Sequence, residues 1–218
     1  STDNLVPIQE GLAYIEHHML HFLENHDEQR IASAGFAGNA QKGKPAMVVS
    51  ACMSTSPTMI YFGQEVGEPG DGNPGFGSET RTTIFDYWGV PNHQRWMNNG
   101  TFDGGQLNTE EKELRSFYVT LLNTVKDHSA FSGNYKEIHR HNRAHTPYYN
   151  DRVFSFIRWD ESEKLMVISN FDADSTFGFS VSLDWDIINQ WQLKTGVYPM
   201  TNLLTGQSDF KLNDKINT

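Results

Sequence analysis

The sequence predicts an α/β unit in its first part, followed by an all-β unit. In the first part, short apolar runs at 19–23 and 58–63 flank an apolar helical stretch, and polar residues follow each run, which is typical of a β-α-β unit. After Gly133 come several short strand-like runs separated by acidic turns, a pattern typical of an antiparallel sandwich. We expect the boundary between residues 128 and 134.

Composition limits the classes of protein to which the chain can belong. With 37% hydrophobic and 20% charged residues among 218, the chain can form a sizeable core and differs from disordered and coiled-coil sequences. Its net charge of -10 argues against nucleic-acid binding, which needs a basic face. No apolar run approaches the ~20 residues of a membrane span.

The start of the chain and its single cysteine leave the compartment open. The opening "STDNLVPIQEG" has no basic region before an apolar core, so we expect no signal peptide, and it lacks an initiating Met, which is typical of a processed chain or a fragment. Cys52 has no partner for an intrachain disulfide and is predicted to be a small buried residue. Secreted, periplasmic and cytoplasmic locations all stay open.

The α/β unit is expected to begin with a helix and a strand. The helix is predicted over residues 5–18, because apolar residues recur at i, i+4 and i+7 from Ile8. The run "MLHFL" at 19–23 predicts a short buried strand that ends at the polar residues 24–27.

A buried helix, a second strand, a long loop and an amphipathic helix complete this unit. Pro45 can open the helix "AMVVSACMS", and "TMIYFG" predicts a parallel strand covered on both faces. Residues 63–106 are rich in Gly, Pro and Asn and predict a long loop of the kind that is usually functional. The helix over 108–127 starts at Asn108, which Glu111 can join in a capping box.

Five runs predict the strands of the all-β unit. They are "DRVFSFIRW", "KLMVISNF", "FGFSVSL", "QWQLKTG" and "TNLLTG". The triplet Arg158-Trp159-Asp160 is predicted to be a strand end and turn. Alternation could place His139 and His141 on one strand face as a metal pair, but no Cys or nearby carboxylate completes a set, which favours histidines that simply lie at the surface.

The stretch "ENHDEQR" at 24–30 concentrates titratable groups directly after an apolar strand. Functional side chains often follow the strands of a parallel sheet. Asp27 could bind sugar hydroxyls or stabilise developing positive charge, His26 could donate to a hydroxyl, and Arg30 could keep carboxylates ionised. The alternative is a helix cap by Asp27 with His26 merely solvated.

Two motifs in this order resemble the alpha-amylase family, glycoside hydrolase family 13. They are "FLENHDEQRIAS" and, some thirty residues later, "MIYFGQEVG". In that family an Asn-His-Asp motif closes strand seven of a (β/α)8 TIM barrel, and a Tyr-x-Gly-x-Glu stretch ends strand eight. The resemblance implies that residues 1–131 are the last part of the barrel, with strands 7–8 and flanking helices, and that 133–218 are a C-terminal antiparallel β-sandwich.

The resemblance also implies roles for individual residues. Asp27 matches the third catalytic carboxylate, which stabilises the transition state, and His26 matches a histidine that hydrogen-bonds the same sugar. Asn25 and Arg30 match supporting positions. Glu65 and the loop after it, which carries Trp88, would shape the rim of the substrate site. The implied substrates are α-1,4-glucans such as starch and malto-oligosaccharides.

One catalytic carboxylate out of three is present. Retaining glycoside hydrolysis needs a nucleophile and a general acid/base about 5 Å apart, and in the family both come before the Asn-His-Asp motif. Here only Asp3, Glu10, Glu16 and Glu24 precede Asp27. We therefore expect the isolated chain to be inactive and to need no cofactor, whereas the parent enzyme could bind calcium. The exposed strand edges of the isolated chain must be covered by the missing N-terminal part of the barrel or by self-association.

Two alternatives stay open. The first is a non-catalytic glucan-binding piece, in which loop aromatics such as Trp88 and Trp96 hold the sugar without cleaving it. The second is an amylase-like accessory subunit of a membrane assembly, which would need an anchor that this sequence does not contain.

Overall fold

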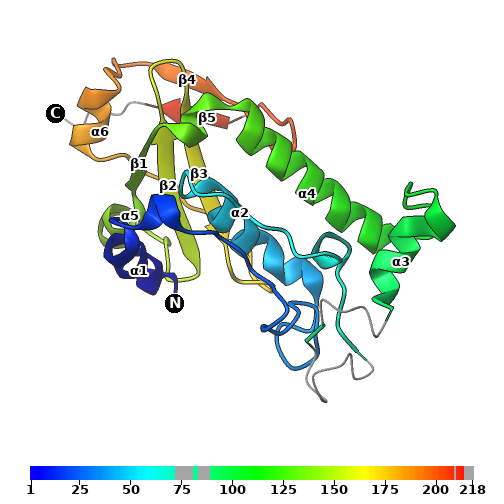
Figure 1. Cartoon of the computed structure of the whole chain (residues 1–218). Coiled ribbons are helices and arrows are strands. Elements are labelled where there is room, and N and C mark those ends of the chain that lie inside the picture. Colours follow the sequence, from blue (N-terminus) through cyan, green and yellow to red (C-terminus); the bar gives the residue numbers. More distant parts are fainter. Residues whose placement is uncertain (72–80, 83–88, 209, 214–218) are drawn as a thin grey trace.

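The computed structural model of the chain describes residues 1–71, 81–82, 89–208 and 210–213 (Figure 1). The helices are α1 (Leu5–Leu12), α2 (Lys44–Cys52), α3 (Pro91–Met97), α4 (Thr109–Asp127), α5 (His139–His145) and α6 (Trp185–Gln190). The strands are β1 (Asn134–Glu137), β2 (Val153–Trp159), β3 (Lys164–Asn170), β4 (Val197–Met200) and β5 (Phe210–Asn213). Within the described residues, no helix is both long and apolar enough to cross a bilayer.

The two strands predicted in the first part make one parallel contact. His21 pairs with Thr58 in a single parallel bridge. The His21 N–H donates to the Pro57 carbonyl at 2.9 Å, and the Met59 N–H donates to the His21 carbonyl at 2.8 Å. Neither run forms a longer strand among the described residues. The helix expected over 5–18 also stops early, because α1 ends at Leu12 and a separate 3-10 turn follows.

The two central helices follow the sequence prediction. Pro45 lies in the first turn of α2, where its missing N–H costs nothing. At the start of α4, the Asn108 side chain accepts from the Glu111 N–H at 2.9 Å, and Glu111 accepts from the Asn108 N–H at 3.0 Å, which confirms the capping box. The loop predicted over 63–106 was only partly correct, since α3 lies within it.

The later part of the chain contains two antiparallel sheets. Strands β1, β2 and β3 lie side by side in that order, and β4 pairs with β5. The predictions for "DRVFSFIRW" and "KLMVISNF" are confirmed as β2 and β3. The other three runs were wrongly predicted: none is a strand, and "TNLLTG" forms a turn. The strand face proposed for His139 and His141 was also wrong, because both residues lie in the helix α5.

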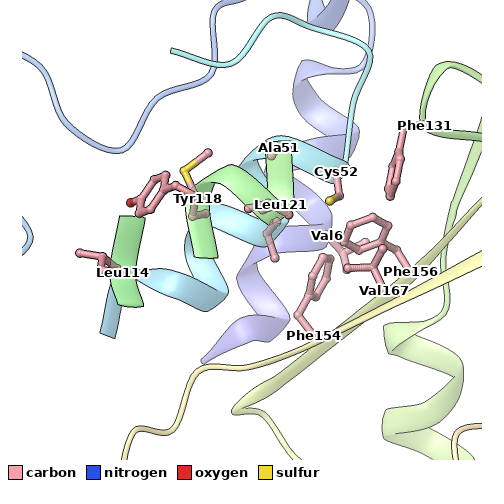
Figure 2. Close-up of a cluster of buried hydrophobic side chains, with 12 residues drawn as sticks. Val6, Ala51, Cys52, Leu114, Tyr118, Leu121, Phe131, Phe154, Phe156 and Val167 are labelled. Carbon is pink, nitrogen blue, oxygen red and sulfur yellow. The ribbon is translucent and has the colours of Figure 1, made fainter. Parts of the chain in front are cut away.

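One hydrophobic core joins residues from both sides of the predicted domain boundary. It packs α2 and α4 against β2 and β3, with side chains from both parts in contact (Figure 2). Its buried members are Val6, Met47, Val49, Ala51, Cys52, Leu114, Tyr118, Leu121, Phe131, Phe154, Phe156 and Val167. The barrel and sandwich assignments, with their 1–131 and 133–218 bounds, stay predictions.

Buried polar side chains reinforce this packing. The fully buried Arg158 of β2 donates to the Met53 carbonyl at 2.7 Å and to the Gly133 carbonyl at 3.2 Å. Close to the first residues, Asp3 accepts from the buried His139 at 2.8 Å, and the contacts with Arg143 and His139 lower the pKa of Asp3 to about 2. The first helical segment is therefore fixed to the later sheet.

Candidate functional site

A tight turn presents the predicted catalytic residue. The Asn25 side-chain oxygen accepts from the N–H groups of Asp27 at 2.7 Å and Glu28 at 2.9 Å, which is an Asx turn. The turn leaves the side chains of His26 and Asp27 45% and 73% exposed. The His26 Nε2 lies 3.3 Å from the Asp27 Oδ2, so an imidazole and a carboxylate point together into solvent.

Beneath this turn lies a buried ion pair. Glu24 and Arg30 are 2% and 0% exposed, and the Arg30 Nη1 donates to the Glu24 Oε2 at 2.8 Å. The other Glu24 oxygen accepts from the Ile31 N–H at 2.7 Å. Burial raises the pKa of the Glu24 carboxyl, and the Arg30 guanidinium and the Ile31 N–H oppose that rise. The buried pair therefore closes residues 24–30 into a compact loop.

Arg30 also connects this loop to two other segments. Its Nη2 donates to the Phe62 carbonyl at 2.9 Å and to the Thr82 hydroxyl at 2.6 Å, and its Nε reaches the same hydroxyl at 2.9 Å. The guanidinium lies 4.4 Å from the centre of the Tyr61 ring, whose hydroxyl donates to the Thr82 carbonyl at 3.0 Å. Burial raises the pKa of Tyr61, which keeps that hydroxyl a donor.

This arrangement suits the binding of hydroxyl groups. An exposed carboxylate can accept two or more hydrogen bonds, and an imidazole can donate or accept. Both groups lie on a backbone that the buried, hydrogen-bonded Glu24 and Arg30 side chains hold from below. Precise placement of polar groups of this kind is what binding and catalysis require.

The structure separates the predicted site residues into three groups. Asn25, His26 and Asp27 share one turn, and Arg30 lies buried beneath it. Glu65 lies in the short 3-10 helix Gln64–Val66 and lines a pocket whose wall includes no residue of the Asn25–Asp27 turn. Trp88 falls outside the described residues.

The pocket that contains Glu65 lies between α3, α4 and the segment 58–62. Its volume is about 370 Å³. Trp96, which sequence reasoning offered as an aromatic sugar contact, is part of its wall and stacks on His93 with ring centres 5.5 Å apart. Its lining residues are Ile60, Phe62, Glu65, His93, Trp96, Arg115, Tyr118, Val119 and Leu122.

Sequence reasoning missed the residues that support the turn from below. It assigned no role to Glu24, although a glutamate directly after an apolar run is a candidate for a buried pair. Nothing in the sequence around Thr82 signals that its hydroxyl would bond a guanidinium fifty-two residues away. It also missed Glu68, which is 1% exposed and accepts from the Gly70 and Asn92 N–H groups, thereby fixing the start of α3.

The other candidates from the sequence have structural partners. Asp160 accepts from the N–H groups of Ser162 and Glu163, both at 2.8 Å, so the predicted strand-end turn is confirmed. His139 is 1% exposed and bonds Asp3 and the Tyr149 hydroxyl. In the parts of the chain that are described, no three side chains of His, Cys, Asp or Glu converge as metal ligands. Calcium in a longer protein stays a prediction.

Comparison with known proteins gives a match to a solved structure. No protein-family model matches the sequence, and no curated protein shows a significant match. The fold is similar to the crystal structure of AmyP in complex with maltose, with a TM-score of 0.57 and 21% sequence identity. The match covers 93% of this chain and 39% of the AmyP chain. The likeness at this identity shows a shared fold over less than half of AmyP.

Proposed function

We propose that the chain is the C-terminal portion of an alpha-amylase-family glycoside hydrolase that acts on α-1,4-glucans by a retaining mechanism. The observation that carries this proposal is the exposed Asn25–Asp27 turn, held on the buried Glu24–Arg30 pair. The motif resemblance supports it, and so does the shared fold with a protein that was solved with maltose. In this proposal residues 1–131 are the end of a (β/α)8 barrel and 133–218 a β-sandwich.

The proposed roles follow from the chemistry of each group. Asp27 accepts hydrogen bonds from sugar hydroxyls and stabilises the positive charge that develops on the sugar in the oxocarbenium-like transition state. His26, 3.3 Å away, donates to a hydroxyl of the same sugar. Asn25 and Arg30 position the turn. The motif match extends the proposed rim to Glu65 and Trp88.

The isolated chain is proposed to be inactive. Glu24 is the acidic residue closest in sequence before Asp27, and it is buried in a pair with Arg30, so it is unable to attack or protonate a substrate. A retaining enzyme needs two further carboxylates about 5 Å apart. We propose that the missing N-terminal part of the barrel supplies both and covers the exposed strand edges. Alternatively, self-association covers these strand edges.

Reducing-sugar release from malto-oligosaccharides tests this proposal. The samples are the 218-residue chain, the longest natural chain that contains it, and that longer chain with Asp27→Asn or Glu28→Gln. Glu28 is the matched control, since it is exposed and lies next to Asp27. We expect the short chain to be silent, Asp27→Asn to lower kcat by about 10²-fold or more, and Glu28→Gln to change it less than about twofold.

Two results would contradict the proposal. Hydrolysis by the 218-residue chain at enzymatic rates would mean that the missing carboxylates are not needed. Full activity of Asp27→Asn in the longer chain would remove Asp27 from the catalytic site. Silence of every sample, combined with retained glucan affinity, would instead favour the binding-only alternative.

A further inference from the structure

Two histidines lie one helical turn apart on α5. His141 and His145 are four positions apart in the sequence, and residues at this spacing lie on the same face of a helix. Their ring centres are 5.0 Å apart, and the ring planes are inclined by 50°. In Figure 1, α5 lies next to α1 and on the opposite side of the molecule from α3. The helix α5 contributes no residue to the Asn25–Asp27 turn or to the pocket around Glu65.

The ring nitrogens of this pair differ from those of His139, which the sequence analysis paired with His141. His139 is buried, and its two ring nitrogens lie 3.0 Å from the Tyr149 hydroxyl and 2.8 Å from the Asp3 carboxylate. His141 is half-buried and His145 is exposed, and neither ring makes a hydrogen bond within the described part of the chain. An imidazole nitrogen without a protein partner is available as a metal ligand.

The separation of the two rings fits coordination of a single ion. An imidazole whose nitrogen lies about 2.0–2.1 Å from an ion has its ring centre about 3.2 Å from that ion, so two such rings lie roughly 4.5–5.2 Å apart at angles of about 90–109°. The observed 5.0 Å lies within this range. The adjacent His17 and His18 have ring centres 3.9 Å apart, which is shorter than this range. His141 and His145 therefore have the spacing of a chelating pair.

The backbone between the two histidines is fixed by Asn142. This residue is 0% exposed, and its side chain donates to the Ile138 carbonyl at 2.8 Å and to the Ser182 carbonyl at 2.9 Å. Its side-chain oxygen accepts from the Ser182 N–H at 2.8 Å and from the Thr146 hydroxyl at 2.6 Å. Ligands on a fixed backbone lose less conformational freedom when they bind. The turn that carries both histidines is thus held in place before an ion binds.

The two arginines of α5 are each paired with a carboxylate. Arg140 donates to the two oxygens of Glu10 at 2.5 Å and 2.9 Å, and Arg143 donates to Asp3 at 3.0 Å. These pairs reduce the repulsion that the guanidinium groups exert on a divalent cation at the same helix. The net charge of -10 favours the approach of a cation.

We infer that His141 and His145 together bind one borderline transition-metal ion, such as Zn²⁺ or Ni²⁺, at the surface of α5. Imidazole nitrogen is a ligand that these ions prefer, whereas Mg²⁺ and Ca²⁺ prefer oxygen. Two protein ligands are fewer than the four of a structural zinc site, so water completes the coordination shell and binding is weaker. The inference is independent of the proposed function, which assigns no role to either histidine.

Calorimetric titration of the 218-residue chain with Ni²⁺ tests the inference. The variants are His141→Ala, His145→Ala and the double variant. His17→Ala is the matched control, because it removes an exposed histidine that also has a histidine beside it. If two ligands supply about half of the binding free energy of a four-ligand zinc site, the tightest site should bind one ion with a Kd of about 1–200 µM.

The expected result is loss of the same site in all three variants. His141→Ala and His145→Ala should each bind Ni²⁺ at least tenfold more weakly than the unchanged chain, and the double variant should lie within twofold of the single ones, because a chelate needs both rings. His17→Ala should keep its affinity within twofold. Unchanged affinity of His141→Ala or His145→Ala would overturn the inference, as would an equal loss in His17→Ala. Mg²⁺ binding of similar strength would also overturn it, in favour of a general attraction of cations.

Unfolding in urea separates metal binding from a merely structural role. In metal-free buffer the double variant should keep the urea midpoint of the unchanged chain, because neither ring has a hydrogen bond to lose among the described residues. Ni²⁺ should raise the midpoint of the unchanged chain and leave that of the double variant where it is, because an ion that binds only the folded state stabilises it. An equal rise in both chains would contradict the inference. If an alanine variant fails to fold, His141→Gln and His145→Gln replace it in the same titrations.

Discussion

The base of the Asn25–Asp27 turn buries two charged side chains, whereas the pocket around Glu65 buries single polar atoms of two others, and the outcomes are opposite. Under the turn, the three guanidinium nitrogens of Arg30 and both oxygens of Glu24 have partners. In the pocket, one nitrogen of Arg115 and one oxygen of Glu65 have none among the described residues. The first region is complete as it stands, and the second lacks an element that the longer protein is proposed to supply.

This difference in pairing fits the different roles proposed for the two regions. A substrate rim must be fixed, which the paired network ensures. A surface that receives another segment must leave its backbone edge and its polar atoms free until that segment is present. The same short run, 58–62, serves both, because Phe62 accepts from Arg30 through its carbonyl and lines the pocket with its ring.

Removal of the guanidinium under the turn should have the largest effect on stability. In the 218-residue chain, Arg30→Met leaves Glu24 buried without its counter-charge, and we expect the free energy of unfolding to fall by about 3–5 kcal/mol. Arg115→Met is the matched control, because among the described residues its Nε makes no hydrogen bond, and loss of the guanidinium 5.2 Å from the Trp96 ring should cost only about 1 kcal/mol. Urea unfolding measures both. Similar losses for the two variants would remove the distinction between the regions.

A smaller effect on stability is expected from the turn itself. Asn25→Ala removes the side-chain acceptor for the N–H groups of Asp27 and Glu28, both of which lie at the surface, and we expect a loss of about 1 kcal/mol. In the longer chain the same change should lower kcat by about 10²-fold, because Asp27 loses its fixed position. Loss of stability with unchanged kcat would show that the turn does not position Asp27.

Local sequence signals predicted the parts of the fold that depend on neighbouring residues. The capping box of α4 needs only Asn108 and Glu111, three positions apart; β2 is rich in β-branched and aromatic residues, and β3 contains the apolar run 165–168. The strand predicted at "QWQLKTG" was wrong because Asp184 caps the preceding helix α6, and the chain leaves that helix in a turn. The strand prediction for the histidines of α5 was wrong for another reason: alternation over a few residues does not distinguish the period of a strand from that of a helix.

The site was predictable where the residues are adjacent and not where they are distant. Asn25, His26 and Asp27 share one turn, so their motif indicated their common location. Arg30 and Thr82 are fifty-two positions apart in the sequence, and no periodic pattern reports such a contact. Glu65 belongs to the second motif in the sequence, yet its side chain lines the pocket next to α4.

Hydrogen exchange in the two chain lengths tests most directly the claim that the turn is complete and the pocket is not. The Ile31 amide, which already donates to Glu24, should exchange at rates within about threefold of each other in the 218-residue chain and the longest natural chain. The Ile60 amide, which has no partner among the described residues, should exchange at least about 100-fold more slowly in the longer chain. Unchanged exchange at Ile60, or an equal slowing at Ile31 and Ile60, would contradict the account.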